Sequence, residues 1–330
     1  MHSVSPSAGL SDSKRVIGIV GPTASGKTVL ADRIAHDLAS EIVTADSMQV
    51  YRGMDIGTAK PPMQERSVTH HCLDLVDPGA PYSAALFQSD ARSIIDALLG
   101  AEKTPVLCGG TGLYIRAALD DMQFPSGELS SNSRFELEKL AKQIGPQAMH
   151  DKLDIVDPDS AALIHPNNVR RTIRALEIAA QGGSYAQLAA GFSKRCEHYP
   201  SVLIGLSMDR EVLYARIDAR VDGMIESGLL HEVEQLLDAG FREALTAAQA
   251  IGYKELVPVL ETGQDLREAV ALIKQATRRY AKRQITWFKA DPRIQWIDVT
   301  NMSVDDVALV ASDLLASIGL EYRPNGEPAT

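Results

Sequence analysis

Cysteine and long apolar runs are both scarce in this sequence of 330 residues. The three cysteines, Cys72, Cys108 and Cys196, are odd in number and form no CxxC pair, which argues against a disulfide framework or a structural zinc site. We therefore expect a reducing, cytoplasmic location. No apolar run reaches the length of a bilayer-spanning helix, so we expect no membrane partner.

Positive charge is also in deficit, because 33 Lys and Arg residues face 43 Asp and Glu residues, for a net charge of -10. This balance predicts that nucleic acid is repelled by the molecule as a whole. Residues 270–293 are an exception, with seven Lys or Arg residues and one Asp. A solvated helix face usually mixes both signs, so this one-sided stretch is typical of an RNA-binding surface whose affinity falls as salt rises.

The length suits a core domain that carries a smaller insertion. Residues 1–15 are rich in serine and lack an apolar central region, so they are predicted to be a disordered tail rather than a secretory signal. Residues 16–118 and 201–322 are predicted to form the core, with a second tail at 323–330. Residues 119–200 contain apolar positions at helical spacing and are predicted to form an inserted, mostly helical domain.

The segment GPTASGKT, residues 21–28, has the G-x-x-x-x-G-K-T spacing of a phosphate-binding P-loop. An apolar run at 16–20 precedes it, and apolar residues four apart follow it in 27–40, which predicts a strand, a loop and an amphipathic helix. Loop amides and the helix N-terminus attract phosphate, Lys27 adds a positive charge, and the Thr28 hydroxyl can bind Mg²⁺. We therefore predict an α/β fold with a P-loop NTPase-like parallel sheet flanked by helices.

Further strands are predicted at residues 41–45, 72–76 and 105–108. The first leads directly into Asp46 and Ser47. Because ligands bind at the carboxyl edge of an open parallel sheet, we expect Asp46 to lie beside the P-loop, although a lone aspartate after a strand more often only caps a turn.

The phosphate loop does not fit the commonest classes of nucleotide-binding protein. A Rossmann site is not indicated, because no G-x-G-x-x-G segment follows a strand. P-loop NTPases hold magnesium with a second acid after an apolar strand, whereas the strand at 105–108 runs into the glycine-rich turn 109–112. The sequence also lacks the NKxD motif of GTPases. These absences favour a phosphate ester other than a nucleoside triphosphate.

Six motifs between residues 16 and 298 together resemble the tRNA dimethylallyltransferases, also called tRNA isopentenyltransferases or the IPP transferase family. They are GPTASGKT (21–28), ADSMQVYRGMDIGTAKP (45–61), GGTGLY (109–114), HPNNVRRTIRALE (165–177), AIGYKEL (250–256) and TRRYAKRQITWF (277–288). The resemblance implies transfer of a dimethylallyl group from dimethylallyl diphosphate to the N6 amine of the adenosine 3′-adjacent to a tRNA anticodon. Mg²⁺ is the implied cofactor, and the tRNA anticodon stem-loop is the implied partner of an enzyme that we expect to be monomeric.

The resemblance also implies roles for individual residues. Asp46 is expected to accept a hydrogen bond from the adenine amine. Arg220 is expected to contact the diphosphate, with Arg216 as a second candidate. The predicted catalytic residues are Asp46, Lys27, Thr23, Arg220 and Thr111. The predicted diphosphate site comprises Gly21, Pro22, Thr23, Ala24, Ser25, Gly26, Lys27, Thr28 and Arg220, with Thr28 as the metal ligand.

The predicted tRNA contacts fall on five separate parts of the sequence. Asp46, Ser47, Met48, Gln49 and Thr111 are expected to receive the extruded adenine, which must leave its stack to reach the catalytic groups. The remaining contacts are Arg134, Arg170, Arg171, Thr172, Ile173 and Arg174 in the insertion, and Gln249, Ala250, Ile251, Gly252, Tyr253 and Lys254. The aromatic residues Tyr280, Trp287 and Phe288 are assigned to the core.

Three other functions remain open from the residues alone. A P-loop small-molecule kinase would share the fold but would use a triphosphate. An isopentenyltransferase for free adenine nucleotides would share Asp46 and the loop, but it would leave the insertion and basic clusters without purpose. A non-catalytic RNA-binding module would explain the basic clusters and leave the phosphate loop unexplained.

Overall fold

The computed structural model describes residues 15–124, 132–193, 195–244, 246–317 and 319–320. One compact unit contains the described residues up to Leu119 and from His198 onward, and a second contains those of Asp120–Glu197. The insertion predicted from the sequence runs from 119 to 200. The predicted tails, 1–15 and 323–330, lie outside the described residues except for Arg15.

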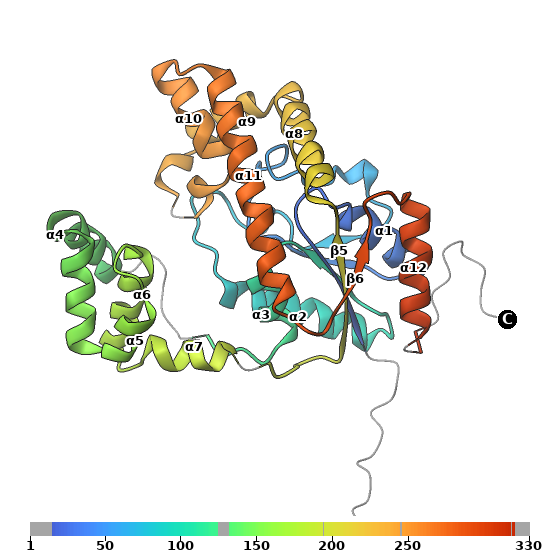
Figure 1. Ribbon diagram of the computed structural model, residues 1–330, viewed down its shortest axis with the longest axis horizontal. Helices are drawn as coiled ribbons and strands as arrows, with labels where there is room; N and C mark the ends of the chain where they lie inside the picture. The colour runs from blue at the N-terminus through green and yellow to red at the C-terminus, as the bar shows by residue number, and fades with distance from the viewer. Residues whose placement is uncertain (1–14, 125–131, 194, 245, 318, 321–330) are drawn as a thin grey trace, which may run out of the picture. The chain divides into compact units, whose positions relative to one another are not determined.

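A parallel sheet forms the centre of the first unit (Figure 1). Its six strands lie in the order β3-β2-β4-β1-β5-β6, and all neighbours are parallel. The strands are β1 (Val16–Val20), β2 (Ile42–Ala45), β3 (His70–His71), β4 (Val106–Gly109), β5 (Ser201–Ser207) and β6 (Ile294–Asp298). Every residue of β1, β2 and β4 is buried, as expected for parallel strands covered on both faces. The predicted parallel α/β architecture is confirmed.

Helices cover both faces of this sheet (Figure 1). The helices of this unit are α1 (Lys27–Asp37), α2 (Ala84–Gly100), α3 (Gly112–Leu119), α8 (Arg210–Glu226), α9 (Leu229–Asp238), α10 (Tyr253–Thr262), α11 (Leu266–Lys289) and α12 (Val304–Ala316), with 3-10 turns at Met63–Glu65, Phe241–Glu243 and Ala247–Gln249. Of these, α9 and α10 lie away from the sheet and pack against α8 and α11 (Figure 1). Apolar residues of α1 and α12 share one core cluster with β1, β4 and β5. No described helix combines the length and apolarity needed to cross a bilayer.

The strand predicted at 72–76 is wrong. The observed strand β3 covers only His70–His71, because Cys72 and Asp74 adopt left-handed backbone conformations, with φ of 60° and 54°, that break the pleat. Val76 forms only an isolated bridge with Tyr51.

The second unit is helical and has a small core of its own. Its helices are α4 (Asn132–Val156), α5 (Pro158–Leu163), α6 (Val169–Ala180) and α7 (Tyr185–Ser193). Leu153, Ala161, Ile164 and Ala175 pack together at the centre. Helix α4 is kinked at Gly145, which has a non-helical φ of 82°. The next residue is Pro146, which cannot donate a backbone hydrogen bond.

Candidate active site

The P-loop connects β1 to α1 through backbone conformations that favour glycine. Gly21 has a φ of 153°, and a Cβ atom there would lie 2.9 Å from the Leu206 carbonyl oxygen. Ala24 and Gly26 have φ of 65° and 88°, so the loop curls tightly before the first turn of α1. Free amides of that turn form an anion site. The Ser25 hydroxyl is buried without a hydrogen-bond partner in the described part of the chain, which fits a loop built to receive phosphate oxygens.

Lys27 extends from the start of α1 toward the loop, where its ammonium donates a hydrogen bond to the Pro22 carbonyl at 3.2 Å. Desolvation by the surrounding protein lowers the pKa of Lys27; Arg220 acts in the same direction, and Cys108 and Asp46 oppose it. Desolvation also lowers the pKa of Arg220, and the Asp46 carboxylate opposes that shift. Two desolvated cations with a single nearby carboxylate favour binding of a multiply charged anion.

Asp46 stands at the carboxyl end of β2, as the sequence predicted. Its Oδ1 accepts a hydrogen bond from the Met48 amide at 2.9 Å, which fixes the carboxylate in an Asx turn. Within the described residues Oδ2 makes no hydrogen bond and is free to accept one from a ligand. The Thr111 hydroxyl accepts from the Ser47 amide at 3.0 Å and lies 3.3 Å from the Ser47 hydroxyl, so it positions this turn.

Two cavities of the first unit meet at this carboxylate. The smaller has a volume of about 60 Å³ and is lined by residues that include Lys27 and Thr28. The larger has a volume of about 440 Å³ and is lined by residues that include Ser47, Met48, Arg279, Arg283 and the whole segment 249–254. Residues that line both are Thr23, Asp46, Thr58, Arg220 and Tyr280. The small compartment beside the P-loop, called the phosphate compartment below, thus adjoins a larger one.

Helix α11 completes the site in a way that the sequence did not indicate. The Gln284 carboxamide accepts from the Thr23 amide at 2.9 Å and donates to the Gly110 carbonyl at 2.9 Å, which links the P-loop to the glycine-rich turn. A Cβ at Gly110 would lie 2.3 Å from Gln284 Nε2, and one at Gly112 would lie 2.0 Å from the Trp287 ring. These glycines therefore allow α11 to approach; the contacts join residues 174 or more positions apart.

The assignment of the α11 aromatic residues to the core was correct only for Phe288, which is buried. Tyr280 lines both cavities, and Trp287 is 46% exposed. A helix with one covered face buries some aromatic residues and exposes others, and composition does not distinguish them.

Several residues that the sequence analysis assigned to ligand binding lie in environments that differ from the prediction. Arg216 is exposed and lines neither cavity, so the second candidate for diphosphate contact is wrong. Gln49 is buried beside the smaller cavity, and its amide donates to the Thr58 carbonyl at 3.1 Å. In the basic stretch, the cations of residues 274, 278 and 293 pair with nearby aspartates, which reduces the local excess of positive charge.

The predicted tRNA contacts of the second unit also differ among themselves. Thr172 and Ile173 are buried in that unit, so their side chains are not available to a ligand, contrary to the prediction. Arg134 and Arg174 both pair with Glu177, at 3.6 and 3.2 Å. Of the predicted contacts in this unit, Arg170 and Arg171 are exposed and form no ion pair with any described residue.

The described residues contain no group of three His, Cys, Asp or Glu side chains that could hold a metal ion alone. Thr28 is exposed to the smaller cavity and lies beside Lys27. A metal at this place would therefore depend on oxygen ligands from a bound phosphate ester, which suits a hard cation such as Mg²⁺.

Comparisons with known proteins identify the family of this chain. The model of the IPP transferase family matches residues 49–291, and that of the isopentenyl transferases matches residues 14–73. A tRNA dimethylallyltransferase from Alkaliphilus metalliredigens is 45% identical over 89% of this chain and 95% of its own length. The tRNA dimethylallyltransferase 1 of Pelobacter propionicus is 49% identical over 86% and 92%.

Solved structures show the same relationship. A tRNA isopentenylpyrophosphate transferase from Bacillus halodurans is 42% identical, with a TM-score of 0.69, over 92% of this chain and 96% of its own. A eukaryotic dimethylallyltransferase acting on tRNA is 28% identical, with a TM-score of 0.77, over 96% and 82%. With a phosphate loop, an adjoining carboxylate and sequence matches along most of its length, the chain belongs to the tRNA dimethylallyltransferase family, the IPP transferases.

Proposed function

We propose that this enzyme transfers the dimethylallyl group of dimethylallyl diphosphate to the N6 amine of the adenosine 3′-adjacent to a tRNA anticodon. The observation that carries the proposal is the shared wall of the two cavities, where Asp46, Arg220 and Thr23 face both the phosphate compartment and the larger one. A donor diphosphate and an acceptor adenine placed in these compartments meet at Asp46.

In this reaction a carbon–oxygen bond of the donor breaks and a bond from N6 to the allylic carbon forms. The electron pair of the broken bond leaves with the diphosphate, while positive charge develops on the allyl group. Catalysis therefore requires preorganised positive groups around the departing oxygens. Lys27, Arg220, the loop amides and the Ser25 hydroxyl supply them in this chain.

Asp46 has the complementary task at the acceptor. The adenine amine is a weak nucleophile, because its lone pair is delocalised into the ring, and it must lose a proton as the new bond forms. Oδ2 of Asp46 can accept that proton while Oδ1 stays bonded to Met48. The Ser47 and Thr111 hydroxyls lie beside it and are placed to orient the base.

Mg²⁺ is the proposed cofactor, and the Thr28 hydroxyl would hold it together with oxygen atoms of the bound diphosphate. When bound, it supplies further stabilisation of the charge on the leaving diphosphate.

The proposed acceptor is the anticodon stem-loop of a tRNA, and we accordingly place the enzyme in the cytoplasm. Arg279 and Arg283 line the larger cavity together with Gln249 and Lys254, and they are suited to contact the backbone of the extruded nucleotide. In the second unit, the exposed Arg170 and Arg171 are the proposed phosphate contacts.

The deciding experiment incubates the protein with unmodified tRNA, Mg²⁺ and labelled dimethylallyl diphosphate and identifies the labelled nucleoside after digestion. Label in N6-dimethylallyl adenosine next to the anticodon supports the proposal. Label in free AMP alone would indicate an enzyme for free nucleotides. Hydrolysis of ATP with a phosphorylated product would indicate a kinase, and tRNA binding without any transfer would indicate a non-catalytic module.

A further inference from the structure

Residues 54–60 form an irregular loop that reaches the cavities, and a buried carboxylate from α9 holds its backbone. Glu232 Oε2 accepts hydrogen bonds from the amides of Asp55 and Ile56, at 3.1 and 2.7 Å, and Oε1 accepts from the Gly57 amide at 3.1 Å. Glu232 is only 8% exposed. One side chain thus satisfies three consecutive amides that no regular secondary structure satisfies.

The fourth partner of Glu232 comes from α10. The Tyr253 hydroxyl donates to Oε1 at 2.6 Å, and burial, followed by the neighbouring carboxylate, raises the pKa of Tyr253 and keeps it a donor. The Tyr253 ring packs against Gly57 so closely that a Cβ there would lie 2.4 Å from it. Glycine at this position is therefore required for the loop to lie on the tyrosine.

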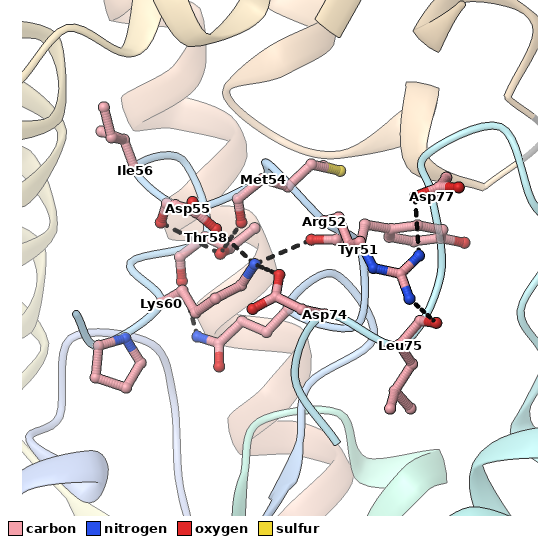
Figure 2. A network of polar contacts seen from close by, with 12 residues as sticks. Tyr51, Arg52, Met54, Asp55, Ile56, Thr58, Lys60, Asp74, Leu75 and Asp77 are labelled. Atoms are coloured by element: carbon pink, nitrogen blue, oxygen red, sulfur yellow. Dashed lines mark hydrogen bonds and ion pairs between the residues drawn. The ribbon is translucent and has the colours of Figure 1, made fainter. Parts of the chain in front are cut away.

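The other end of the loop is held by a second set of polar contacts, shown in Figure 2. The buried Lys60 ammonium donates to Asp55 and Asp74 at 2.5 Å each, and to the Tyr51 carbonyl at 3.0 Å. The Thr58 hydroxyl donates to the Met54 carbonyl at 2.7 Å. With both ends fixed, the backbone of residue 58 has little freedom to move.

This loop in turn contacts a cation of the active site. The Thr58 carbonyl accepts a hydrogen bond from Arg220 Nη2 at 3.4 Å, and both residues line the two cavities. Among the described residues, no side chain of α8 hydrogen-bonds the Arg220 guanidinium, so the Thr58 carbonyl is the contact that holds it beside the phosphate compartment.

We propose that Glu232 is a positioning residue: by holding the amides of residues 55–57, it sets the place of the Thr58 carbonyl and so aims Arg220 at the departing diphosphate. This role rests on the proposed function. Glutamine at position 232 would present an amide group to two of the four donors in place of an oxygen, so Glu232→Gln loosens the loop with little change of volume.

The test compares Glu232→Gln with Glu234→Gln, a control on the same helix whose side chain is 60% exposed. We expect Glu232→Gln to lower kcat about 100-fold, as a misplaced catalytic group does, and to weaken binding of inorganic diphosphate, whereas Glu234→Gln stays within about threefold of wild type. The KM for tRNA should change less than kcat.

A double-mutant cycle separates positioning from a general loss of structure. If Glu232 acts through Arg220, Glu232→Gln lowers kcat by less than about threefold in an Arg220→Ala enzyme. The same 100-fold loss in both backgrounds overturns the proposal. If thermal melting shows that Glu232→Gln does not fold, Tyr253→Phe replaces it in the same cycle. This change removes one of the four hydrogen bonds that Glu232 accepts. A wild-type protein without transferase activity contradicts the proposed function, whereas an active wild type with a normal Glu232→Gln variant contradicts this inference alone.

Discussion

Replacing Lys27 by alanine removes a single charge from the wall of the phosphate compartment and tests how the leaving group is stabilised. Two charges about 4 Å apart at an effective dielectric constant of 20 interact by about 4 kcal/mol. Removal of one preorganised donor from a developing oxyanion costs about 2.7–4 kcal/mol. Both magnitudes predict that kcat of Lys27→Ala falls about 10²- to 10³-fold.

The measurement is single-turnover transfer of labelled dimethylallyl to tRNA, with thermal melting as a check on folding. The melting temperature should be nearly unchanged, because Lys27 lies in a desolvated place and, among the described residues, its ammonium makes one hydrogen bond, to the Pro22 carbonyl at 3.2 Å. Lys152→Ala, on the exposed surface of α4, serves as the control. A folded Lys27→Ala enzyme within tenfold of wild type would refute the assignment of the loop to the departing diphosphate.

The lowered pKa of Lys27 also predicts a pH dependence that wild type shows and Lys27→Ala lacks. Desolvation is the main cause, so between the folded pKa and the ordinary value of 10.5 the unfolded chain binds more protons than the folded one. In that window the free energy of unfolding rises with pH while the charged amine, and with it the affinity for diphosphate, is lost. Titration calorimetry with inorganic diphosphate should show this alkaline decline in wild type and not in Lys27→Ala.

Three further changes probe separate parts of the chain. Asp46→Ala should lower kcat about 10²- to 10⁴-fold while tRNA binding persists, and near-normal transfer would exclude Asp46 as the base. Gly109→Ala should lower the free energy of unfolding by about 3 kcal/mol or more, because the new Cβ would lie 2.1 Å from the Ala45 carbonyl oxygen. Denaturant titration measures this change, and an unchanged midpoint would contradict the packing. Arg171→Ala should weaken tRNA binding and make the slope of log K against log salt less negative by about one, with kcat at saturating tRNA unchanged; an unaltered slope would remove this phosphate contact.

The parts of the site that lie close together in the sequence were predictable. The P-loop, the start of α1 and the placement of Asp46 after β2 follow from short-range rules: apolar runs form parallel strands, and glycine permits the left-handed turn before the helix. Arg220 was predicted through the family resemblance, since a single arginine on a helix surface carries no such signal. The extent of β3 was mispredicted, because the apolar residues of 72–76 gave no warning of the left-handed conformations at Cys72 and Asp74.

Sequence by itself determined the phosphate-binding loop, the parallel sheet and the family, because these depend on local backbone preference and on the periodicity of apolar residues. Tertiary structure decided which distant side chains complete the site. Gln284 meets Thr23 from 261 positions away, and Glu232 meets the amide of Asp55 from 177 positions away. Neither partner is marked by a local pattern, because a buried polar group is selected by the unpaired amides that the fold brings to it, and only the folded chain brings them together.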